Sequence, residues 1–418
     1  MKKIYWIVGL LACVIHGNAQ HSRTLLLKNA TIIDGDASVA PRKGNVLLRQ
    51  GMIAGVLYDS TVAADSVIDC TGKFITPGLM DAHVHLATMG MDHQQAAERT
   101  TDSILQNMLR HGITTVRDMA GDAVFLARYS RLAATGQLLS PDIFYAAQFA
   151  GPGYFELVGK GSRESADLGT TPWYCAITPQ TDLRLAVAAA KGAGVTGIKV
   201  YADLSREQIA AITQEAHRQG IQVWSHGAVF PAKPADAVAA GANSLSHAND
   251  LCFQQLPGDT LEISGAWQQL YKGFVLDTSV QISLLKQMKE KGIFLDPTVF
   301  HAGNNKMENA FIITRLAHRL GVSVVAGTDW IYPAKAEPVP LMEEMKLLVA
   351  RCGMSPAQVL QCATLNGALV TGLKDRGLVR ADKKADLLIL DADPLKDVTR
   401  LFSPKIVIKH GIVLKIQP

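Results

Sequence analysis

The sequence predicts an α/β protein with a large (β/α)8 barrel and a small β-sandwich domain formed from both chain ends. Through the middle of the chain, eight short apolar runs alternate with helical stretches, the pattern of a parallel sheet covered by helices. Both ends instead carry β-like runs separated by turn signals. Because a barrel uses about 250 residues, a chain of 418 leaves room for one smaller domain. We expect residues 20–76 and 373–418 to form the sandwich and residues 77–372 the barrel.

The first nineteen residues have the pattern of an export signal, with two lysines, an apolar run over residues 4–15 and a small-residue exit over residues 17–19. We expect cleavage near Ala19 and a secreted or periplasmic mature protein that starts near Gln20. The apolar run is too short to span a bilayer comfortably, so no stable membrane span is expected. Two alternatives stay open: an uncleaved anchor, and a lipoprotein that carries its lipid on Cys13.

The β-like runs at the two ends supply the strands of the predicted sandwich. They cover residues 24–27, 30–33, 45–49, 52–56 and 67–69 near the N-terminus, and 386–390, 405–409 and 412–415 near the C-terminus. The last two runs flank His410 and Gly411 and predict a hairpin. Since neither piece is sufficient alone, we predict a single sheet built from both.

Eight candidate barrel strands lie between these ends, at residues 80–85, 114–117, 143–147, 197–201, 222–225, 244–246, 294–296 and 323–326. The clearest helix between them covers residues 205–219, where Ser205 and Gln208 offer a capping box and Gly220 an exit. A second, alanine-rich helix is expected over residues 181–190. Barrel active sites lie at the carboxyl ends of the strands, so polar residues placed there should meet at one mouth.

His83 and His85 stand two residues apart at the end of the first candidate strand, where alternate residues point to the same face. Both imidazoles can therefore reach one metal ion, although two histidines on an exposed strand face would show the same spacing. Further ligand-type residues close later apolar runs: Lys199, His226, His247 and Asp329. Together these residues predict a metal site. Zinc suits such ligands and leaves one position for water, while manganese, cobalt and iron are alternatives.

The ligands divide into two predicted clusters. One ion would be held by His83, His85 and Asp329, and a second by His226 and His247. Two ions need a bridging anion, whereas an unmodified lysine is a cation at neutral pH. Lys199 therefore fits as a ligand if the pKa of its amine is lowered and carbon dioxide converts it to a carbamate. A lysine that points from a strand end to solvent is the alternative.

Some neighbouring residues are candidates for substrate contacts. Tyr201 follows Lys199 on the same strand face and could hydrogen-bond a substrate carbonyl or carboxylate, or could simply pack. His301, beyond the seventh candidate strand, could contact substrate or lie on the surface. At the end of the second strand, we expect Arg117 and Asp118 to take part in an internal ion pair. The long connections over residues 151–179 and 250–278 could cover the pocket or mediate oligomer contacts.

Several of these segments together resemble the amidohydrolase superfamily: Thr76-Pro-Gly-Leu-Met-Asp before the H-x-H pair, the Lys, His, His and Asp ligands in that order, Thr114-Thr-Val-Arg-Asp118, and the closing Ala385-Asp-Leu-Leu. Within it, the chain is most similar to the imidazolonepropionase-related branch, including dipeptidase-type members with a carboxylated lysine. The resemblance implies a barrel with a β-sandwich, two divalent ions, zinc foremost, bridged by carboxylated Lys199, and amide hydrolysis by metal-bound hydroxide. It also implies that Asp329 takes a proton from the hydroxide and passes it to the leaving nitrogen.

The predicted function is an exported metal-dependent amidohydrolase that cleaves an Xaa-Pro-like dipeptide or an N-acyl amino acid. Three alternatives stay open: a hydrolase that opens a cyclic amide, lactam or imidazolone, a lactone or phosphoester hydrolase, and a non-catalytic barrel that binds a small molecule. Nucleic-acid binding is not expected, because the net charge is only +4 and no segment interleaves basic and aromatic residues. A homo-oligomer is compatible with a barrel of this kind.

Overall fold

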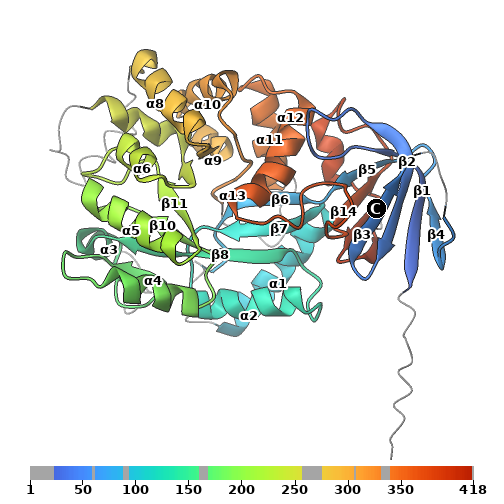
Figure 1. The fold of residues 1–418 in the computed structure, drawn as a ribbon, viewed down its shortest axis with the longest axis horizontal. Coiled ribbons are helices and arrows are strands. Elements are labelled where there is room, and N and C mark those ends of the chain that lie inside the picture. Colours follow the sequence, from blue (N-terminus) through green and yellow to red (C-terminus); the bar gives the residue numbers. More distant parts are fainter. Residues whose placement is uncertain are drawn as a thin grey trace, which may run out of the picture.

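A computed structural model describes residues 23–58, 62–87, 94–159, 168–256, 275–305, 307–330 and 339–416. These residues form two adjoining units, a barrel wrapped by helices and a sheet at one end of the molecule (Figure 1). The expected export signal, with Ala19 and Cys13, lies outside the described residues. Within the described ranges, no helix has the length and apolar character needed to cross a membrane.

Both chain ends contribute to one eight-stranded sheet, which confirms the predicted β domain. Its strands are β1 (Thr24–Ile32), β2 (Arg42–Arg49), β3 (Met52–Leu57), β4 (Ser66–Asp69), β5 (Phe74–Pro77), β14 (Leu387–Leu390), β15 (Ile406–Lys409) and β16 (Ile412–Lys415). They run in the order β16-β15-β14-β5-β1-β2-β3, with β4 paired to β1. The two ends meet where β14 pairs antiparallel with β5, and β15 and β16 form the expected hairpin. This sheet has an apolar cluster of its own, which includes Leu27, Ile75 and Leu387.

The first strand is longer than predicted, because the runs at residues 24–27 and 30–33 merge into β1. A bulge between Leu27 and Ala30 shifts the register of β1 against β2. Asn29 has a φ of 64° in the bulge, and its backbone N–H donates to the side-chain oxygen of Asn45 at 2.9 Å. The bulge lets one strand bend where the sequence indicated a break.

Seven parallel strands form the main ladder of a nearly closed barrel surrounded by helices (Figure 1). They are β6 (Leu79–Val84), β7 (Ile113–Asp118), β8 (Asp142–Ala150), β10 (Gly197–Val200), β11 (Gln222–His226), β12 (Ser244–Ser246) and β13 (Phe294–Asp296). A short additional strand, β9 (Tyr174–Ala176), pairs with β8. The first seven predicted barrel strands are thereby confirmed. Since these strands are parallel, their carboxyl ends share one face of the barrel.

The predicted eighth strand, residues 323–326, closes the barrel without becoming a regular strand. On one side it exchanges backbone hydrogen bonds with Leu295 of β13 (2.9 and 3.0 Å), and on the other it accepts one from Ala82 of β6 (2.9 Å). The ladder stops there because the N–H of Ala326 donates to the carbonyl of Cys362 instead. Only an isolated bridge to β13 remains, so the prediction of a regular strand is wrong while the closure it implied is present.

The helices are α1 (Gln94–Arg110), α2 (Ala123–Ala134), α3 (Pro152–Gly159), α4 (Leu183–Gly192), α5 (Arg206–Arg218), α6 (Pro234–Ala240), α8 (Thr278–Glu290), α9 (Val299–Asn304), α10 (Glu308–Leu320), α11 (Pro340–Ala350), α12 (Pro356–Gln361) and α13 (Gly367–Val370), with the shorter segments η2 (Ala248–Gln255), η3 (Cys362–Asn366) and η4 (Val398–Phe402). α5 confirms the predicted helix and its capping box between Ser205 and Gln208. α4 begins two residues later than predicted, because the side chain of Asp182 caps its first turn.

At the amino ends of the barrel strands, a cluster of charged side chains joins the barrel to the sheet. Asp142, the first residue of β8, contacts Arg376 at 2.6 Å, Lys409 at 3.1 Å and His410 at 3.0 Å. Lys409 also pairs with Asp386 at 2.9 Å. We call this set the floor cluster: Asp142, Arg376, Lys384, Asp386, Lys409 and His410. It connects β8 to the C-terminal strands, since Lys409 ends β15 and Asp386 precedes β14.

Candidate active site

The six candidate metal ligands converge at the carboxyl ends of the barrel strands, where they line a pocket of about 570 Å³. Each comes from the position that barrel geometry dictates: within or just beyond β6, β10, β11 and β12, and after the closing segment. The ligands are His83, His85, Lys199, His226, His247 and Asp329. Residues that are up to about 250 positions apart in sequence thus share one pocket because parallel strands end on the same face.

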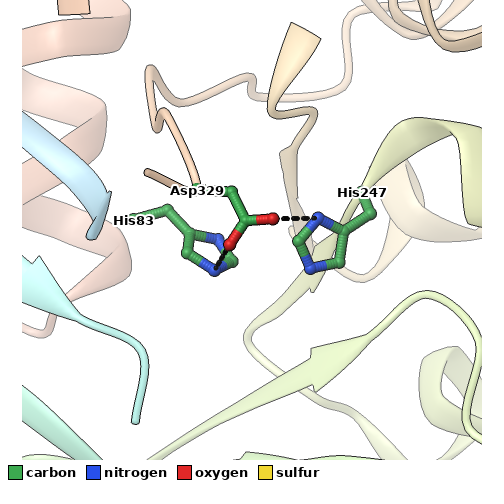
Figure 2. Close-up of side chains that lie close together, drawn as sticks. All are labelled: His83, His247 and Asp329. Carbon is green, nitrogen blue, oxygen red and sulfur yellow. Dashed lines mark ion pairs between the residues drawn. The ribbon is translucent and has the colours of Figure 1, made fainter. Parts of the chain in front are cut away.

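The carboxylate of Asp329 lies at the centre of this group. Its Oδ1 is 3.2 Å from Nε2 of His83 and 3.1 Å from Nε2 of His85. Its Oδ2 is 3.7 Å from Nδ1 of His247 and 3.6 Å from Nδ1 of His301. Figure 2 shows the carboxylate between His83 and His247, with one oxygen directed at each ring. One carboxylate is therefore surrounded by four imidazoles.

The second pair of candidate ligands adjoins the first group. The rings of His226 and His247 have centroids 4.4 Å apart, and the ring of His247 is 5.0 Å from that of His83. Lys199 lies among them and is only 1 % exposed. Its Nζ donates to the hydroxyl of Ser246 at 3.1 Å. Lys199 therefore points into the site and does not point to solvent.

Asp296, the last residue of β13, connects the two groups. Its Oδ2 accepts hydrogen bonds from Nδ1 of His83 at 2.7 Å and from the hydroxyl of Ser246 at 3.1 Å. Because Ser246 also accepts from Lys199, one hydrogen-bonded chain runs from Lys199 through Ser246 and Asp296 to His83. A proton on Nδ1 of His83 leaves its Nε2 free toward Asp329, which is how a neighbouring carboxylate orients a ligating imidazole.

The backbone around His83 is tied to the segment that carries Asp329. The side chain of Asp81 accepts from the N–H of His83 at 3.1 Å, and from the N–H and hydroxyl of Thr328 at 3.1 and 2.9 Å. Gly327 permits this approach, because a Cβ there would lie 2.8 Å from the Cβ of His83 and 2.6 Å from Oδ1 of Asp296. The hydrogen bonds of Asp81 thus fix the distance between His83 and Asp329 through the backbone segments that carry these two residues.

Three residues at the mouth have left-handed backbone conformations that residues with side chains rarely adopt. The φ angles are 67° for His247, 48° for Thr298 and 52° for Asp329. The hydroxyl of Thr298 also lies 3.0 Å from Nδ1 of His247. Such conformations persist where the surrounding structure holds them in place, and they gather at functional sites.

Burial controls the charge states in the pocket. It lowers the pKa of His226 and His247 well below the usual histidine value, and it lowers the pKa of Lys199 to about 8 against the attraction of nearby carboxylates. Burial alone would raise the pKa of Asp329, but the charge and hydrogen bond of His83 outweigh it and hold that pKa well below its usual range. Neutral imidazoles and an ionised carboxylate are the forms that bind metal ions.

The two candidate substrate contacts both line the pocket. The ring of Tyr201 is 4.5 Å from that of His226 and 4.7 Å from that of Tyr154. His301, in α9, is 31 % exposed and directs Nδ1 toward Asp329. His301 therefore faces the site, although its outer edge reaches solvent.

Arg117 forms an internal ion pair, as expected, but its partner is Asp296 at 3.0 Å and not its neighbour Asp118. Adjacent strand residues point to opposite faces, so the two side chains diverge. Arg117 points into the barrel, where its guanidinium lies 4.7 Å from the ring of Trp224. Asp118 instead accepts backbone hydrogen bonds from Leu86 and Ala120.

Sequence reasoning missed two buried carboxylates in this region. Asp296 closes a predicted strand, so the strand-end argument that selected the other ligands would have selected it as well. Asp250 lies in η2, with its Oδ2 3.2 Å from Nδ1 of His226. Burial and the charge of Asp329 raise the pKa of Asp250 well above its usual range. No periodic pattern marks Asp250, whose only signal is its closeness to His247 in the sequence.

The donor set at the mouth suits a divalent cation. Among the described residues, two groups bring three histidine or carboxylate ligand atoms within 4.8 Å of one another: His83, His247 and Asp329 at the mouth, and Asp142, Asp386 and His410 at the floor. The floor group is already paired with arginine and lysine. The mouth group joins imidazole nitrogens to one carboxylate, which is a typical ligand set for zinc. The mouth is therefore the candidate metal centre.

Comparisons with known proteins identify the family of the chain. A family model described as "Amidohydrolase family" matches residues 74–413. The ochratoxinase of Aspergillus niger is 25 % identical over 391 residues, which cover 80 % of this chain and 73 % of that protein. The imidazolonepropionase of Deinococcus deserti is 25 % identical over 380 residues, covering 84 % and 86 %. A solved structure of an Xaa-Pro dipeptidase with bound methionine has the same fold, with a TM-score of 0.74 at 18 % identity and coverage of 94 % and 100 %. The chain belongs to the amidohydrolase family and is a hydrolase that acts on carbon–nitrogen bonds.

Proposed function

We propose that the chain is an exported metal-dependent amidohydrolase that cleaves the amide bond of an Xaa-Pro-like dipeptide or an N-acyl amino acid. Membership of the amidohydrolase family supports the class of bond. The observation that carries the proposal is the ionised, partly buried carboxylate of Asp329, which is in contact with His83 and His85 and faces His247. This arrangement combines a metal-binding ligand set with a carboxylate that can move a proton.

Two divalent ions, zinc foremost, are proposed for the mouth, with manganese, cobalt and iron as alternatives. The first would be held by His83, His85 and Asp329, and the second by His226 and His247. Ions held there supply Lewis acidity, which polarises a substrate carbonyl and acidifies water.

Carboxylation of Lys199 is proposed to provide the bridging anion. The amine is buried beneath the histidines, and its lowered pKa, about 8, increases the unprotonated fraction that reacts with carbon dioxide. The hydroxyl of Ser246, 3.1 Å from Nζ, would remain beside the carbamate. Conversion of a cation to an anion would also remove the repulsion between Lys199 and bound metal ions.

Asp329 is proposed to act as the proton-transfer group. As general base it would take a proton from the attacking water, and as general acid it would return that proton to the leaving nitrogen. Tyr201 and His301 line the pocket on either side of the ligands. We propose that both contact the substrate, Tyr201 at a carbonyl or carboxylate and His301 near the leaving group.

Metal content and turnover test these proposals together. The purified protein, produced with and without added bicarbonate, is analysed for metal per chain and for hydrolysis of Xaa-Pro dipeptides and N-acyl amino acids. We expect about two ions per chain, as two-metal hydrolytic sites hold, together with amide turnover. One ion per chain would contradict the carbamate bridge, and absence of both metal and turnover would contradict the proposed function.

Variants at Lys199 sharpen this test. Lys199→Ala and Lys199→Arg cannot form the carbamate, so both should hold about one ion per chain in place of two. Added short-chain carboxylates should restore activity to Lys199→Ala, which leaves space for them. They should not restore Lys199→Arg, whose side chain fills the same space and serves as the matched control.

A second candidate is a hydrolase that opens a cyclic amide, lactam or imidazolone. It is favoured by the described lining of the pocket, in which Lys199 is the only lysine or arginine. A compact neutral ring needs no further cation, whereas a free substrate carboxylate does. Cyclic amides, a lactone and a phosphoester therefore belong in the same substrate screen, and binding without turnover would indicate a non-catalytic barrel.

We further propose that residues 1–19 direct export, with cleavage near Ala19 and a secreted or periplasmic mature protein. A lipoprotein modified at Cys13 is the alternative. Residues 20–76 and 373–418 are proposed as the sheet domain and residues 77–372 as the hydrolase domain. N-terminal sequencing of exported protein distinguishes the two cleavage products, and light scattering gives the state of any homo-oligomer.

A further inference from the structure

The pocket has two unlike sides. Beside β7, β8 and β10 most of its lining is apolar or aromatic, and we call these residues the apolar wall: Met119, Ala120, Tyr154, Val158, Leu168 and Tyr174. The side chains of Gln148 in β8 and Lys199 in β10 also line this side. Beyond β12 and β13 the lining is mixed and includes the polar side chains of Asn249, Asp250, Thr298 and His301. A substrate that spans the pocket therefore meets two different environments.

Most of the apolar wall is built by the long connection between β8 and β10. Tyr154 and Val158 belong to α3, Leu168 precedes β9, and Tyr174 begins it. Behind them, Phe155 and the alanines of the neighbouring strands complete an apolar cluster. The connection is anchored at both ends, since β9 pairs with β8 and the N–H of Gly153 donates to Asp203 at 2.7 Å. The described parts of the connection that carry the wall are thus held against β8 and the segment after β10.

A line of rings links the apolar wall to the metal ligands. The rings of His226 and Tyr201 are 4.5 Å apart, and those of Tyr201 and Tyr154 are 4.7 Å apart. Tyr154 and Tyr174 are 9 % and 6 % exposed, so little of each remains open to the pocket. Because only Tyr201 separates the ring of Tyr154 from that of His226, a group attached within a few bonds of the reacting carbon can reach the wall.

The position of Asp329 decides which half of the substrate meets the wall. Asp329 follows the segment that closes the barrel between β13 and β6, whereas α3 and β9 follow β8, on the opposite side of the mouth. In amide hydrolysis water adds to the carbonyl carbon, the C–N bond breaks, and Asp329 transfers the proton from water to the nitrogen. The products are a carboxylate and an amine. The nitrogen must therefore lie on the Asp329 side, and the acyl chain extends toward the wall.

We propose that the apolar wall is a subsite for an uncharged aryl or branched alkyl group on the acyl side of the scissile amide. Preferred substrates are then N-arylacyl or N-alkylacyl compounds, which narrows the proposed function and rests on it. A charged acyl chain is disfavoured because, among the described residues, no side chain of the wall offers an opposite charge, and an unpaired charge is costly to bury.

Two mirrored substrate series test the subsite. In the first, the amine is constant and the acyl group is acetyl, 3-methylbutanoyl, phenylacetyl or succinyl. We expect kcat/KM to rise about 10- to 100-fold from acetyl to phenylacetyl, the gain for burying a phenyl ring, and to fall for succinyl. In the second, the acyl group is acetyl and the aryl group is moved to the amine, with an expected change below about 3-fold. Equal gains in both series, or a larger gain on the amine side, would overturn the proposal.

Two variants in α3 test whether the gain in kcat/KM for phenylacetyl substrates comes from contact with the apolar wall. Val158→Asn places an amide in the subsite and should reduce the ratio of phenylacetyl to acetyl turnover by about 5- to 10-fold. Leu157→Asn is the matched control, because Leu157 is the adjacent residue, is 36 % exposed and lies outside the pocket lining. An unchanged ratio in Val158→Asn, or an equal fall in both variants, would overturn the assignment.

Binding of the acyl products separates this inference from the proposed function. If no amide is hydrolysed, the proposed function fails, but calorimetry on the metal-loaded protein can still compare phenylacetate with acetate. We expect the Kd for phenylacetate to be about 10-fold lower in the unmodified protein, with the difference lost in Val158→Asn. Equal Kd values would overturn the subsite.

Discussion

The mouth and the floor of the barrel both gather histidines and carboxylates, yet their charges are balanced in different ways. At the floor, Asp142 is in contact with Arg376, whose charge is permanent at physiological pH, and with the side chain of Lys409. At the mouth, Asp329 is in contact with imidazoles, which can lose their protons and coordinate a metal ion. A cluster of histidines and carboxylates does not by itself indicate a metal site. The side chains that pair with the carboxylate decide: arginine and lysine indicate a structural ion pair, and imidazoles indicate a candidate metal site.

The pKa values reinforce this contrast. At the floor, burial raises the pKa of Asp142, but hydrogen bonding from His410 and the charges of Lys409 and Arg376 lower it far below the usual range. At the mouth, burial lowers the pKa of His226, His247 and Lys199. The floor is thus a set of satisfied ion pairs, which suits a structural joint, whereas the mouth combines the neutral imidazoles of His226 and His247 with the ionised carboxylate of Asp329, which suits metal binding.

The largest effect should come from Asp329→Asn. The amide retains the shape of the side chain but cannot shuttle a proton, so kcat should fall about 10³- to 10⁴-fold, roughly 4 to 5.5 kcal/mol in the barrier. The measurement is turnover of the best amide found in the screen, with metal content determined on the same sample. Substrate binding that survives the loss of turnover would identify a catalytic role, whereas an unchanged rate would remove Asp329 from the mechanism.

The corresponding change at the floor, Asp142→Asn, should affect stability and not chemistry. It leaves Arg376 and Lys409 without their shared carboxylate, and breaking a buried pair costs about 3–5 kcal/mol. Urea unfolding measures the loss, and turnover per folded molecule should stay within about twofold of the unmodified protein. If Asp142→Asn instead lowered kcat strongly and left the free energy of unfolding unchanged, the floor cluster would have a catalytic role and the contrast with the mouth would be wrong.

A smaller effect is expected for Asp296→Asn, which weakens the hydrogen bond that orients His83. Changes to such supporting residues typically cost about 10- to 100-fold in metal affinity. Competition with a chelator measures that affinity. Asp277→Asn, at the cap of α8, is the matched control because Asp277 does not belong to the pocket lining. Equal affinities for the two variants would show that Asp296 does not position the ligand.

The smallest effect is a pH dependence at the floor. The folded pKa of Asp142 is depressed, so its contribution to stability is complete above its unfolded pKa of about 3.9 and is lost as the pH falls toward the folded value. One carboxyl changes the free energy of unfolding by up to about 1.4 kcal/mol per pH unit in that window. The difference in stability between the unmodified protein and Asp142→Asn should therefore be constant near neutral pH and narrow below about pH 4. A constant difference down to pH 2 would contradict the depressed pKa.

Local signals made the ligands and most barrel strands predictable. The strand that carries His83 is buried throughout, and barrel geometry then requires its carboxyl end to face the mouth. Asp250 could not be found in this way, because it lies in a short helical segment without a periodic pattern. The partner of Arg117 is 179 positions away in sequence, so only the closed barrel reveals it. β9 has three residues, too few for an alternating pattern, which explains why this region was predicted to be loop.

The sheet that both chain ends share affects the order in which the protein can fold. Strand β5 has no partner on one edge until β14 has been synthesised, and Lys73 pairs with Asp391, 318 positions further along the chain. A growing or truncated polypeptide therefore presents an open strand edge, which is a site for aggregation. Contacts between such distant residues also form slowly. The sheet can therefore be completed only after residue 387 has been synthesised, when the whole barrel already precedes it in the chain.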